Sequence, residues 1–408
     1  MTLKEELEIL RGEPIEIFDG DPMEIPCIET SDTEKLCKHP VVSVHMCTYN
    51  HEPYIRQAIE GVMMQKTDFE FELVIGEDAS QDKTREICFE YQKKYPDKIR
   101  VLWWHENVSK FGGNGRRVTA HCRGEFIAFC EGDDYWIDPL KLKKQVEVMR
   151  TCPNVGMCFT DGVVLNQDMG TTSDWDTRKE VQFGLMPGRQ FLFYNIFSHS
   201  PGQPLLRESY LLTASVLVRV TARNNATKNS DILNWKLRLG DVPLWLALAS
   251  TADIYGLGEK TVVYRQHRDG ACTRLGPLLW RDNLLSRMYF LRHSFSLGYA
   301  DLPIPFKRDW CSTNFAILVG EPFLRRIGRL IKILLCPIWR KSLLGATTVD
   351  GVKRLYRRFC PQQANQEYPL GRSTGFHLGI ELLKSLTPDF FIRMCRKFLT
   401  CHRREMIA

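Results

Sequence analysis

The sequence predicts an α/β fold in which a mostly parallel sheet is flanked by helices. The first observation is periodicity, because short apolar runs rich in β-branched and aromatic residues alternate with segments of helical spacing. The second is position, because polar and acidic residues directly follow these runs, at the strand ends where open α/β sheets bind ligands. Alternating strands and helices imply right-handed βαβ units, so consecutive strands are expected to pair in parallel.

Each element is recognised by its apolar spacing and its polar boundaries. The first half of the pattern predicts strands at 41–46, 71–75, 99–103 and 126–130, and helices at 52–65, 82–95 and within 107–122. We expect Ser80 to be the N-cap of the second helix. The second half predicts a helix from Lys141, strands at 155–159, 211–220 and 254–265, a helix at 237–249, and an irregular stretch at 165–210.

Regular alternation occupies only the middle of the chain. Residues up to about Pro40 contain several prolines and little periodicity, which predicts an extended N-terminal leader over residues 1–38. We expect one α/β domain over residues 39–275 and a helical, basic C-terminal region over residues 276–408. The basic residues are concentrated in 323–359, where ten lysines and arginines accompany a single aspartate.

The composition is that of a globular protein rather than a disordered one. The chain has 408 residues, of which 44% are hydrophobic and 25% charged, and a formal net charge of +6. Its 14 cysteines include no CxxC pair, which favours a reducing compartment over a disulfide or zinc framework. We find no signal-peptide pattern, and no apolar run approaches the roughly 20 residues of a membrane span. We therefore expect a cytoplasmic protein.

The basic C-terminal region contains a pattern of its own. Apolar residues recur at helical spacing over 323–335, and basic residues occupy another face. An amphipathic helix of this kind can lie on an anionic membrane surface. The alternative is a helix packed on the rest of the protein, with a solvated basic side. No nucleic-acid partner is expected, because no recognisable binding motif accompanies the charge.

An acidic cluster is the most informative local feature. Glu131, Asp133 and Asp134 directly follow the apolar strand predicted at 126–130. Carboxylates crowded at a strand end repel one another unless a hard cation neutralises them, and Mg²⁺ or Mn²⁺ takes oxygen ligands while leaving positions for substrate phosphates. The alternative is an acidic turn that caps the next helix.

Four loops are expected to converge at the carboxyl ends of neighbouring strands, at 47–52, 76–80, 112–117 and 131–134. Together they offer what a sugar nucleotide needs. Base and ribose would find hydrogen-bond partners in Asn50 and in Glu77 or Asp78, and glycines with Arg116 and Arg117 would suit a diphosphate. Neither a GxGxxG fingerprint nor a P-loop is present, which argues against hydride transfer and P-loop chemistry.

These motifs resemble those of the family 2 glycosyltransferases of the GT-A fold. They are Thr48-Tyr49-Asn50 after the first strand, EDASQD at 77–82 where DDGSTD is usual, the strand entry at 123–128, and EGDDYW at 131–136 in place of DxD. Similar segments follow at 212–216, before the acceptor site, at 240–245, around the catalytic base, and at 264–267, where YRQH resembles YRxH. The resemblance covers residues 38–275. Glu77 and Glu131 depart from the pattern, because aspartate is commoner at both positions.

The resemblance implies inversion at the anomeric carbon in one displacement. Asp241 would be the general base, and Mg²⁺ or Mn²⁺ would be held by Asp133 with Glu131 or Asp134, while His267 would complete the metal site or touch phosphate. The donor would be bound by residues of the loops, namely Thr48, Tyr49, Asn50, Glu52, Glu77, Asp78, Arg116, Arg117, Glu131 and Gly132.

Several of these residues have simpler local interpretations. Asp241 stands where a helix N-cap is expected, His267 could be a core residue, and Arg116 or Arg117 could pack its stem against the sheet. We interpret His45 and His51 as structural.

The implied function is transfer of a sugar from a nucleotide-diphosphate sugar to a glycan or lipid-linked acceptor, in cell-surface polysaccharide biosynthesis. A nucleotidyltransferase would share fold and metal, but residues 41–54 lack its Gly-rich signature with Arg and Lys. A further alternative is a non-catalytic protein that binds nucleotide sugars. Retention of Asp133, Asp241 and His267 together argues against that alternative.

Overall fold

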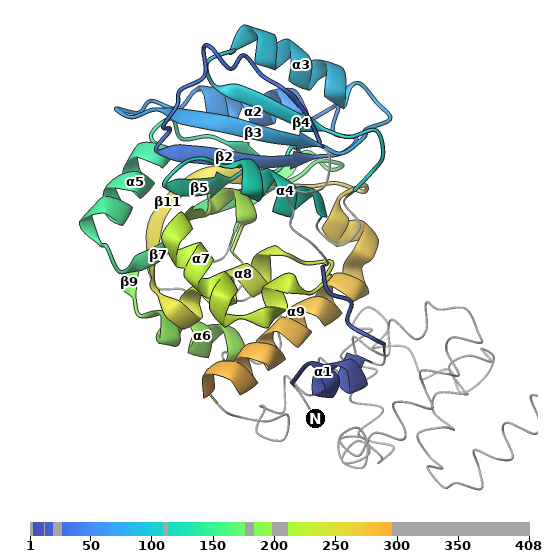
Figure 1. Ribbon diagram of the computed structural model, residues 1–408, viewed down its shortest axis with the longest axis vertical. Coiled ribbons are helices and arrows are strands. Elements are labelled where there is room, and N and C mark those ends of the chain that lie inside the picture. Colours follow the sequence, from blue (N-terminus) through green and yellow to red (C-terminus); the bar gives the residue numbers. More distant parts are fainter. Residues whose placement is uncertain are drawn as a thin grey trace, which may run out of the picture. The chain divides into compact units, whose positions relative to one another are not determined.

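The computed structural model describes residues 3–11, 13–18, 27–108, 113–175, 183–197 and 211–295. All of them belong to one unit that extends from Met1 to Phe323. The described residues form a mixed sheet of eleven strands with helices around it (Figure 1). Its strand order is β1-β4-β3-β2-β5-β10-β7-β11-β6, and β8 pairs with β7 while β9 pairs with β11.

The strands are β1 (Ile28–Thr30), β2 (Val42–Thr48), β3 (Phe71–Glu77), β4 (Ile99–Trp103), β5 (Phe126–Phe129), β6 (Tyr135–Trp136), β7 (Val155–Asn166), β8 (Thr171–Asp174), β9 (Gly184–Met186), β10 (Leu217–Arg219) and β11 (Asp253–Gln266). The helices are α1 (Leu3–Arg11), α2 (Ile55–Met63), α3 (Thr84–Lys94), α4 (Gly113–His121), α5 (Lys141–Thr151), α6 (Gly188–Phe197), α7 (Val220–Asn229), α8 (Asp241–Thr251) and α9 (Ala271–Phe295). Two 3₁₀ turns are η2 (Thr213–Ser215) and η3 (Asp231–Asn234).

The parallel part of the sheet brings the expected loops to one edge. Strands β4, β3, β2 and β5 are neighbours and all run parallel. Thr48 pairs with Glu77, so β2 and β3 end side by side. Outside this group of four strands, β7 and β11 also run parallel to each other. Strand β10 lies between β5 and β7 and is antiparallel to both. The expected fold class, a mostly parallel sheet flanked by helices, is confirmed.

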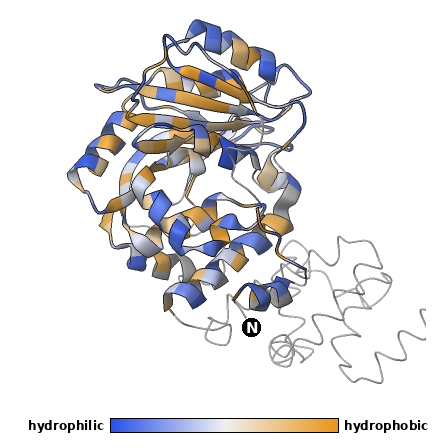
Figure 2. Ribbon diagram, in the orientation of Figure 1, coloured by the Kyte–Doolittle hydropathy of each residue, from blue (hydrophilic) through white to orange (hydrophobic). Residues whose placement is uncertain are grey.

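The two faces of the sheet are covered by different helices. Successive side chains of a strand face opposite sides. On β3, Leu73 and Ile75 therefore join the large core that α2 and α3 help to form, whereas Val74 joins a smaller core with Val118 of α4. The hydrophobic strands stand out in Figure 2, while the helices around them also carry hydrophilic residues.

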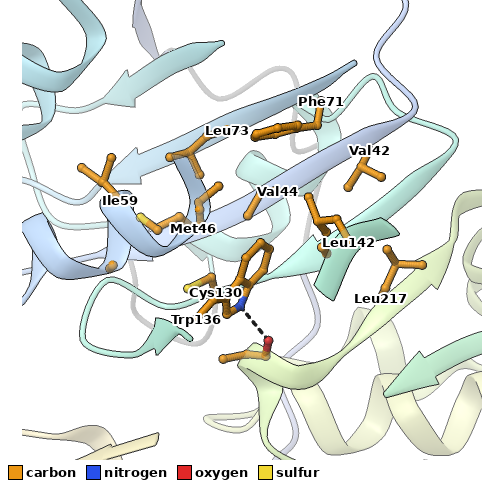
Figure 3. Packing of buried hydrophobic residues seen from close by; sticks show 14 of the residues in the cluster. Val42, Val44, Met46, Ile59, Phe71, Leu73, Cys130, Trp136, Leu142 and Leu217 are labelled. Atoms are coloured by element: carbon orange, nitrogen blue, oxygen red, sulfur yellow. Dashed lines mark hydrogen bonds between the residues drawn. The ribbon is translucent and has the colours of Figure 1, made fainter. Parts of the chain in front are cut away.

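Trp136 anchors the large core at the acidic-cluster end of β5. Its side chain is buried among apolar residues from β2, β3 and α5, and its indole N–H donates to the carbonyl of Ala214 at 2.9 Å (Figure 3). A β-carbon at Gly61 would come within 2.9 Å of the Trp136 backbone, so α2 and β6 approach each other too closely for any other residue. Truncating a buried tryptophan typically costs about 3–5 kcal/mol.

The N-terminal leader is not simply extended, which corrects the expectation from its prolines. Residues Leu3–Arg11 form α1, which contacts α9, and Ile28–Thr30 form β1, which pairs with the edge strand β4. Local periodicity is weak in these segments. They are ordered instead by tertiary contacts, of α1 with α9 and of β1 with the edge of the sheet. The division into domains at 38 and 275 stays a prediction, although α9 crosses residue 275.

Three local predictions also need revision. The N-cap of α3 is Lys83 rather than Ser80, because the Asp82 carboxylate accepts the N–H of Thr84 while the Ser80 hydroxyl accepts the N–H of Asn50. The strand predicted at 211–220 is mainly η2 followed by the short β10. The stretch at 165–210 contains β8, β9 and α6 among its described residues.

The amphipathic pattern at 323–335 lies outside the described residues. Among those that are described, no helix has both the length and the apolar composition needed to cross a membrane.

Candidate active site

Asp133 lies at the centre of the acidic cluster, in the loop between β5 and β6. Its Oδ2 is 3.2 Å from Nε2 of His267 and 3.7 Å from Nε2 of His51. Burial opposes ionisation of this carboxyl, but the two imidazoles outweigh burial and lower the pKa of Asp133. The structure therefore presents an ionised carboxylate between two rings that come from opposite ends of the domain sequence.

Arg265 holds the backbone of the acidic cluster in place. Its Nε donates to the Asp133 carbonyl at 2.7 Å, and its guanidinium also donates to the amide oxygens of Gln57 and Gln167, each at 2.8 Å. The backbone N–H of Arg265 donates to Oδ1 of Asp134 at 2.8 Å. Asp134 is thus buried against β11, and burial raises its pKa.

Gly132 packs the same loop onto the end of β2. Its N–H donates to the Cys47 carbonyl at 3.0 Å. A β-carbon at Gly132 would lie 2.6 Å from Oγ1 of Thr48 and 2.9 Å from Nδ1 of His51. Only glycine fits there, which explains why a glycine separates Glu131 from Asp133 in the motif.

Glu131 lies within electrostatic range of both Asp133 and Asp241, the first residue of α8. Burial raises the pKa of Glu131, and the neighbouring carboxylates of Asp133 and Asp241 raise it further. Its Oε2 is buried and has no hydrogen-bond partner among the described residues. Three carboxylates from two distant segments therefore act on one another in this site.

Asp241 is the first residue of α8, and both of its carboxylate oxygens are engaged. Oδ2 accepts the hydroxyl of Thr213 at 2.9 Å, and Oδ1 accepts the N–H of Val242 at 2.7 Å. The N-cap of α8 is Gly240, and no side-chain cap hydrogen bond is formed, so the interpretation of Asp241 as the N-cap is wrong.

Asn50 and Glu52 connect the loop after β2 to the loop after β3. Asn50 has a positive φ of 55°, and its Oδ1 accepts the N–H of Gln81 at 2.7 Å. Glu52 accepts the N–H of Lys83 at 3.1 Å. Tyr49, which lies between Thr48 and Asn50 in the sequence, is half-buried. These contacts shape the two loops as one unit.

Glu77 and Asp78 are both fully buried and bonded within the protein. Glu77 forms an ion pair with Arg85 and accepts the N–H of Ser80 at 2.7 Å. Asp78 accepts the N–H of Val108 at 2.7 Å. The longer glutamate at position 77 therefore serves the loop that follows β3.

Arg116 and Arg117 lie in different surroundings. Arg116 stacks over Phe18 at 4.2 Å and is half-buried. Arg117 is buried near Trp104, at 5.4 Å from its ring, and burial lowers its pKa. Gly112, which was expected to contribute to the same loop, lies outside the described residues.

A divalent cation would fit beside Asp133 only with help from other ligands. Within the described part of the chain, no three His, Cys, Asp or Glu side chains are grouped so that they could hold a metal ion. The chain does offer the ionised Asp133 and the buried, unpartnered Oε2 of Glu131. Mg²⁺ is usually bound through one or two carboxylates together with substrate phosphates, so this pair of carboxylates suits it.

Sequence reasoning underestimated His51 and Arg265. His51 was interpreted as structural, yet its ring adjoins Asp133, and Arg265 organises the loop. Arg265 stands within the YRQH segment, which was a usable signal. For His51 the local sequence offers none, because its contact with Asp133 spans more than eighty residues.

Comparison with known proteins identifies the family. The model of glycosyl transferase family 2 matches residues 43–211. The putative teichuronic acid biosynthesis glycosyltransferase TuaG of Bacillus subtilis is 33% identical over 229 residues, which are 55% of this chain and 79% of TuaG. The chain belongs to glycosyl transferase family 2.

Two further similarities concern this family 2 protein. An uncharacterised protein of Mycobacterium tuberculosis is 32% identical over 230 residues, which are 56% of this chain but 60% of that relative's length. Among solved structures, Staphylococcus aureus TarS in complex with UDP-GlcNAc is 18% identical with a TM-score of 0.47, over 78% of this chain and 91% of TarS 1–349.

Proposed function

We propose that this family 2 protein is a metal-dependent inverting glycosyltransferase. It moves a sugar from a nucleotide-diphosphate sugar to a glycan or lipid-linked acceptor. The observation that supports the proposal is that the carboxylates of Asp133 and Asp241 both raise the pKa of Glu131, because the reaction needs a base on the acceptor side and carboxylates on the diphosphate side.

Asp241 acts on the acceptor. One of its carboxylate oxygens removes the proton from the acceptor hydroxyl while the oxygen of that hydroxyl attacks the anomeric carbon. The bond from the anomeric carbon to the diphosphate breaks on the opposite face. Asp133, with Glu131 and His267 beside it, would hold Mg²⁺ or Mn²⁺, which neutralises charge on the departing nucleoside diphosphate. The contact with Arg265 gives Asp134 a positioning role rather than a ligand role.

The donor-binding residues follow from the loops at the same sheet edge. We assign donor contact to the segment Thr48-Tyr49-Asn50, to Gly132 and Glu131, and to Asp78 and Arg117 near the end of β3. Glu52, Glu77 and Arg116 support these loops through the contacts described above. The name of TuaG supports a role in cell-surface polysaccharide biosynthesis.

Donor binding is tested by thermal unfolding with UDP, GDP, dTDP, UDP-GlcNAc, GDP-mannose and dTDP-rhamnose, each with and without Mn²⁺. A ligand at 100 times its Kd stabilises the folded protein by about 2.7 kcal/mol. At least one nucleotide should raise the melting temperature only with Mn²⁺, and Asp133→Ala should remove that shift. Equal shifts with and without Mn²⁺ would contradict the metal role.

Catalysis is tested with Asp241→Asn, which preserves size but cannot accept the proton. Turnover of the bound donor, measured as release of nucleoside diphosphate, should fall by about 10²- to 10⁴-fold. Donor affinity should stay within a few fold. Asp253→Asn is the control, because this aspartate accepts the N–H of Gly188 outside the site and should keep turnover. Unchanged turnover in Asp241→Asn would contradict the role of Asp241 as the general base.

The location of the reaction is proposed from the sequence. We infer a cytoplasmic enzyme whose basic segment 323–335 binds the anionic surface of a membrane. Vesicles with anionic lipid should retain the protein at low salt and release it as salt rises, because charge attraction is screened beyond about 10 Å at 0.1 M. Equal binding to neutral and anionic vesicles would contradict this inference.

A further inference from the structure

The turn η2 presents a hydroxyl to the carboxylate of Asp241. Thr213, the first residue of η2, is 28 positions earlier in the chain, and its Oγ1 lies 2.9 Å from Oδ2 of Asp241. An ionised carboxylate only accepts hydrogen bonds, so the threonine hydroxyl is the donor. A hydrogen bond from a neutral donor to a charged acceptor is among the stronger ones in proteins.

The position of η2 is fixed by buried groups on several sides. The Trp136 indole donates to the Ala214 carbonyl, the contact drawn as a dashed line in Figure 3. Nε2 of Gln145 on α5 donates to the Ser215 carbonyl at 2.9 Å and to the Cys158 carbonyl of β7 at 3.0 Å. The turn is therefore tied to β6, α5 and β7 at once.

A chain of buried contacts continues behind Gln145. Its Oε1 accepts a hydrogen bond from Nζ of Lys141 at 2.7 Å, and this amine lies 4.3 Å from the centre of the Trp136 ring. Lys141, Gln145 and Ser215 are each fully buried. Moving η2 would therefore break several buried hydrogen bonds, each of which costs more to break in the core than at the surface.

We propose that Thr213 is a positioning residue for the Asp241 base. The N–H of Val242 holds Oδ1 from within α8, and the Thr213 hydroxyl holds Oδ2 from outside the helix. Two donors on separate elements fix both the place and the rotation of the carboxylate. This inference rests on the proposed role of Asp241, and it adds a residue that acts on the reaction through Asp241.

The experiment compares Thr213→Val, Thr213→Ser and Asp241→Asn in the full chain. The assay is release of nucleoside diphosphate from whichever of UDP-GlcNAc, GDP-mannose and dTDP-rhamnose turns over fastest. Thr213→Val keeps the shape of the side chain without the hydroxyl, so kcat should fall by about 10- to 100-fold while KM for the donor stays within about threefold. Thr213→Ser restores the hydroxyl and should recover kcat to within about threefold of the original protein.

The matched control is Ser215→Ala. Its hydroxyl donates to the Leu212 carbonyl at 2.7 Å, so its removal loosens the same turn without touching Asp241. This variant should lower the melting temperature and keep kcat. If Ser215→Ala slowed turnover as much as Thr213→Val, the effect would belong to the turn and the proposal would be wrong.

A double variant separates this inference from the proposed function. In the Asp241→Asn background, Thr213→Val should cause no further loss, because the group that it positions is already inactive. Full turnover in Asp241→Asn alone would reject the proposed base. A collapse in Asp241→Asn together with normal kcat in Thr213→Val would reject only the role of Thr213.

Discussion

At the scale of single residues, two opposite electrostatic environments lie close together. Asp133 is kept ionised by His51 and His267, whereas burial and neighbouring carboxylates favour the protonated form of Glu131. This arrangement supports the proposed binding of a cation together with a nucleoside diphosphate. In the proposed function, the ionised group would attract the cation, and the protonated group would limit repulsion in its absence.

Lys141 allows a pH-dependent test of the core beneath this site. Burial lowers its pKa from 10.5 to about 7. Between these values the unfolded chain holds a proton that the folded chain lacks, so the free energy of unfolding gains up to about 1.4 kcal/mol per pH unit from this residue. We predict that the free energy of unfolding of Lys141→Met, compared with that of the original protein, is highest below pH 7. This difference should become smaller as the pH rises towards 10.

Urea unfolding across this pH range measures the difference between the two proteins. Lys143→Met is the control, because Lys143 lies on the exposed side of the same helix, and its curve should run parallel to that of the original protein. A Lys141→Met curve that is also parallel would show that the amine is already charged in the folded state.

At the scale of elements, Glu72 holds three parallel strands together. It lies on β3, accepts the Ser43 hydroxyl of β2 at 2.7 Å, and pairs with Arg100 of β4 at 3.3 Å and with Arg123 at 2.6 Å. Its side chain is 1% exposed, so removing it takes one partner from the buried guanidinium of Arg100, which keeps its pair with Glu29, and one from the more exposed guanidinium of Arg123. We predict that Glu72→Ala lowers the free energy of unfolding by about 3–5 kcal/mol.

Chemical denaturation checks the prediction for Glu72. The control is Glu70→Ala, in the loop directly before β3, because Glu70 is 64% exposed and lies 3.7 Å from Lys98. Exposed pairs contribute about 0–1 kcal/mol, so the control should be nearly neutral. A similar small loss for Glu72→Ala would show that the network contributes little.

Elements with strong periodicity were predictable, and those ordered by distant partners were not. The strand predicted at 99–103 has the same bounds as β4, and the helix predicted at 82–95 contains α3. By contrast, β10 pairs with β5 and β7 across long stretches of chain, and only the fold brings them together. The same reason applies to the site. Asp133 and Asp241 were visible as motifs, whereas the contacts of His51, Arg265 and Thr213 depend on tertiary structure.

At the scale of the whole described unit, the N-terminal segment is part of the fold. The N–H of Phe18 donates to the Asn234 carbonyl, and the Glu16 carbonyl accepts the N–H of Lys236, both at 2.8 Å. Further towards the N-terminus, α1 contacts α9. The segment therefore runs along the chain just before α8, which begins with Asp241, so the N-terminus and the site share a structural support.

Asp282 is the residue through which this support can be tested. It lies on α9 with a fully buried side chain, accepts the N–H of Arg238 at 2.9 Å, and is 3.8 Å from Arg11 of α1 and 3.8 Å from Arg281. Removing a buried charge from such a group leaves its partners uncompensated, at a cost of about 3–5 kcal/mol. We predict that Asp282→Ala lowers the midpoint of thermal unfolding strongly, and that deleting residues 1–18 from the original protein also lowers it.

The combined change should lower the midpoint by less than the sum of the two separate effects, because both remove the contact between Arg11 of α1 and Asp282 of α9. Glu16→Ala is the control, since this residue is 65% exposed and pairs with Lys236 at 3.3 Å at the surface, so its midpoint should stay close to that of the original protein. If the deletion left the midpoint unchanged, the N-terminal segment would be an appendage on α9, and the stability of the α8 and α9 layer would arise from its own packing alone.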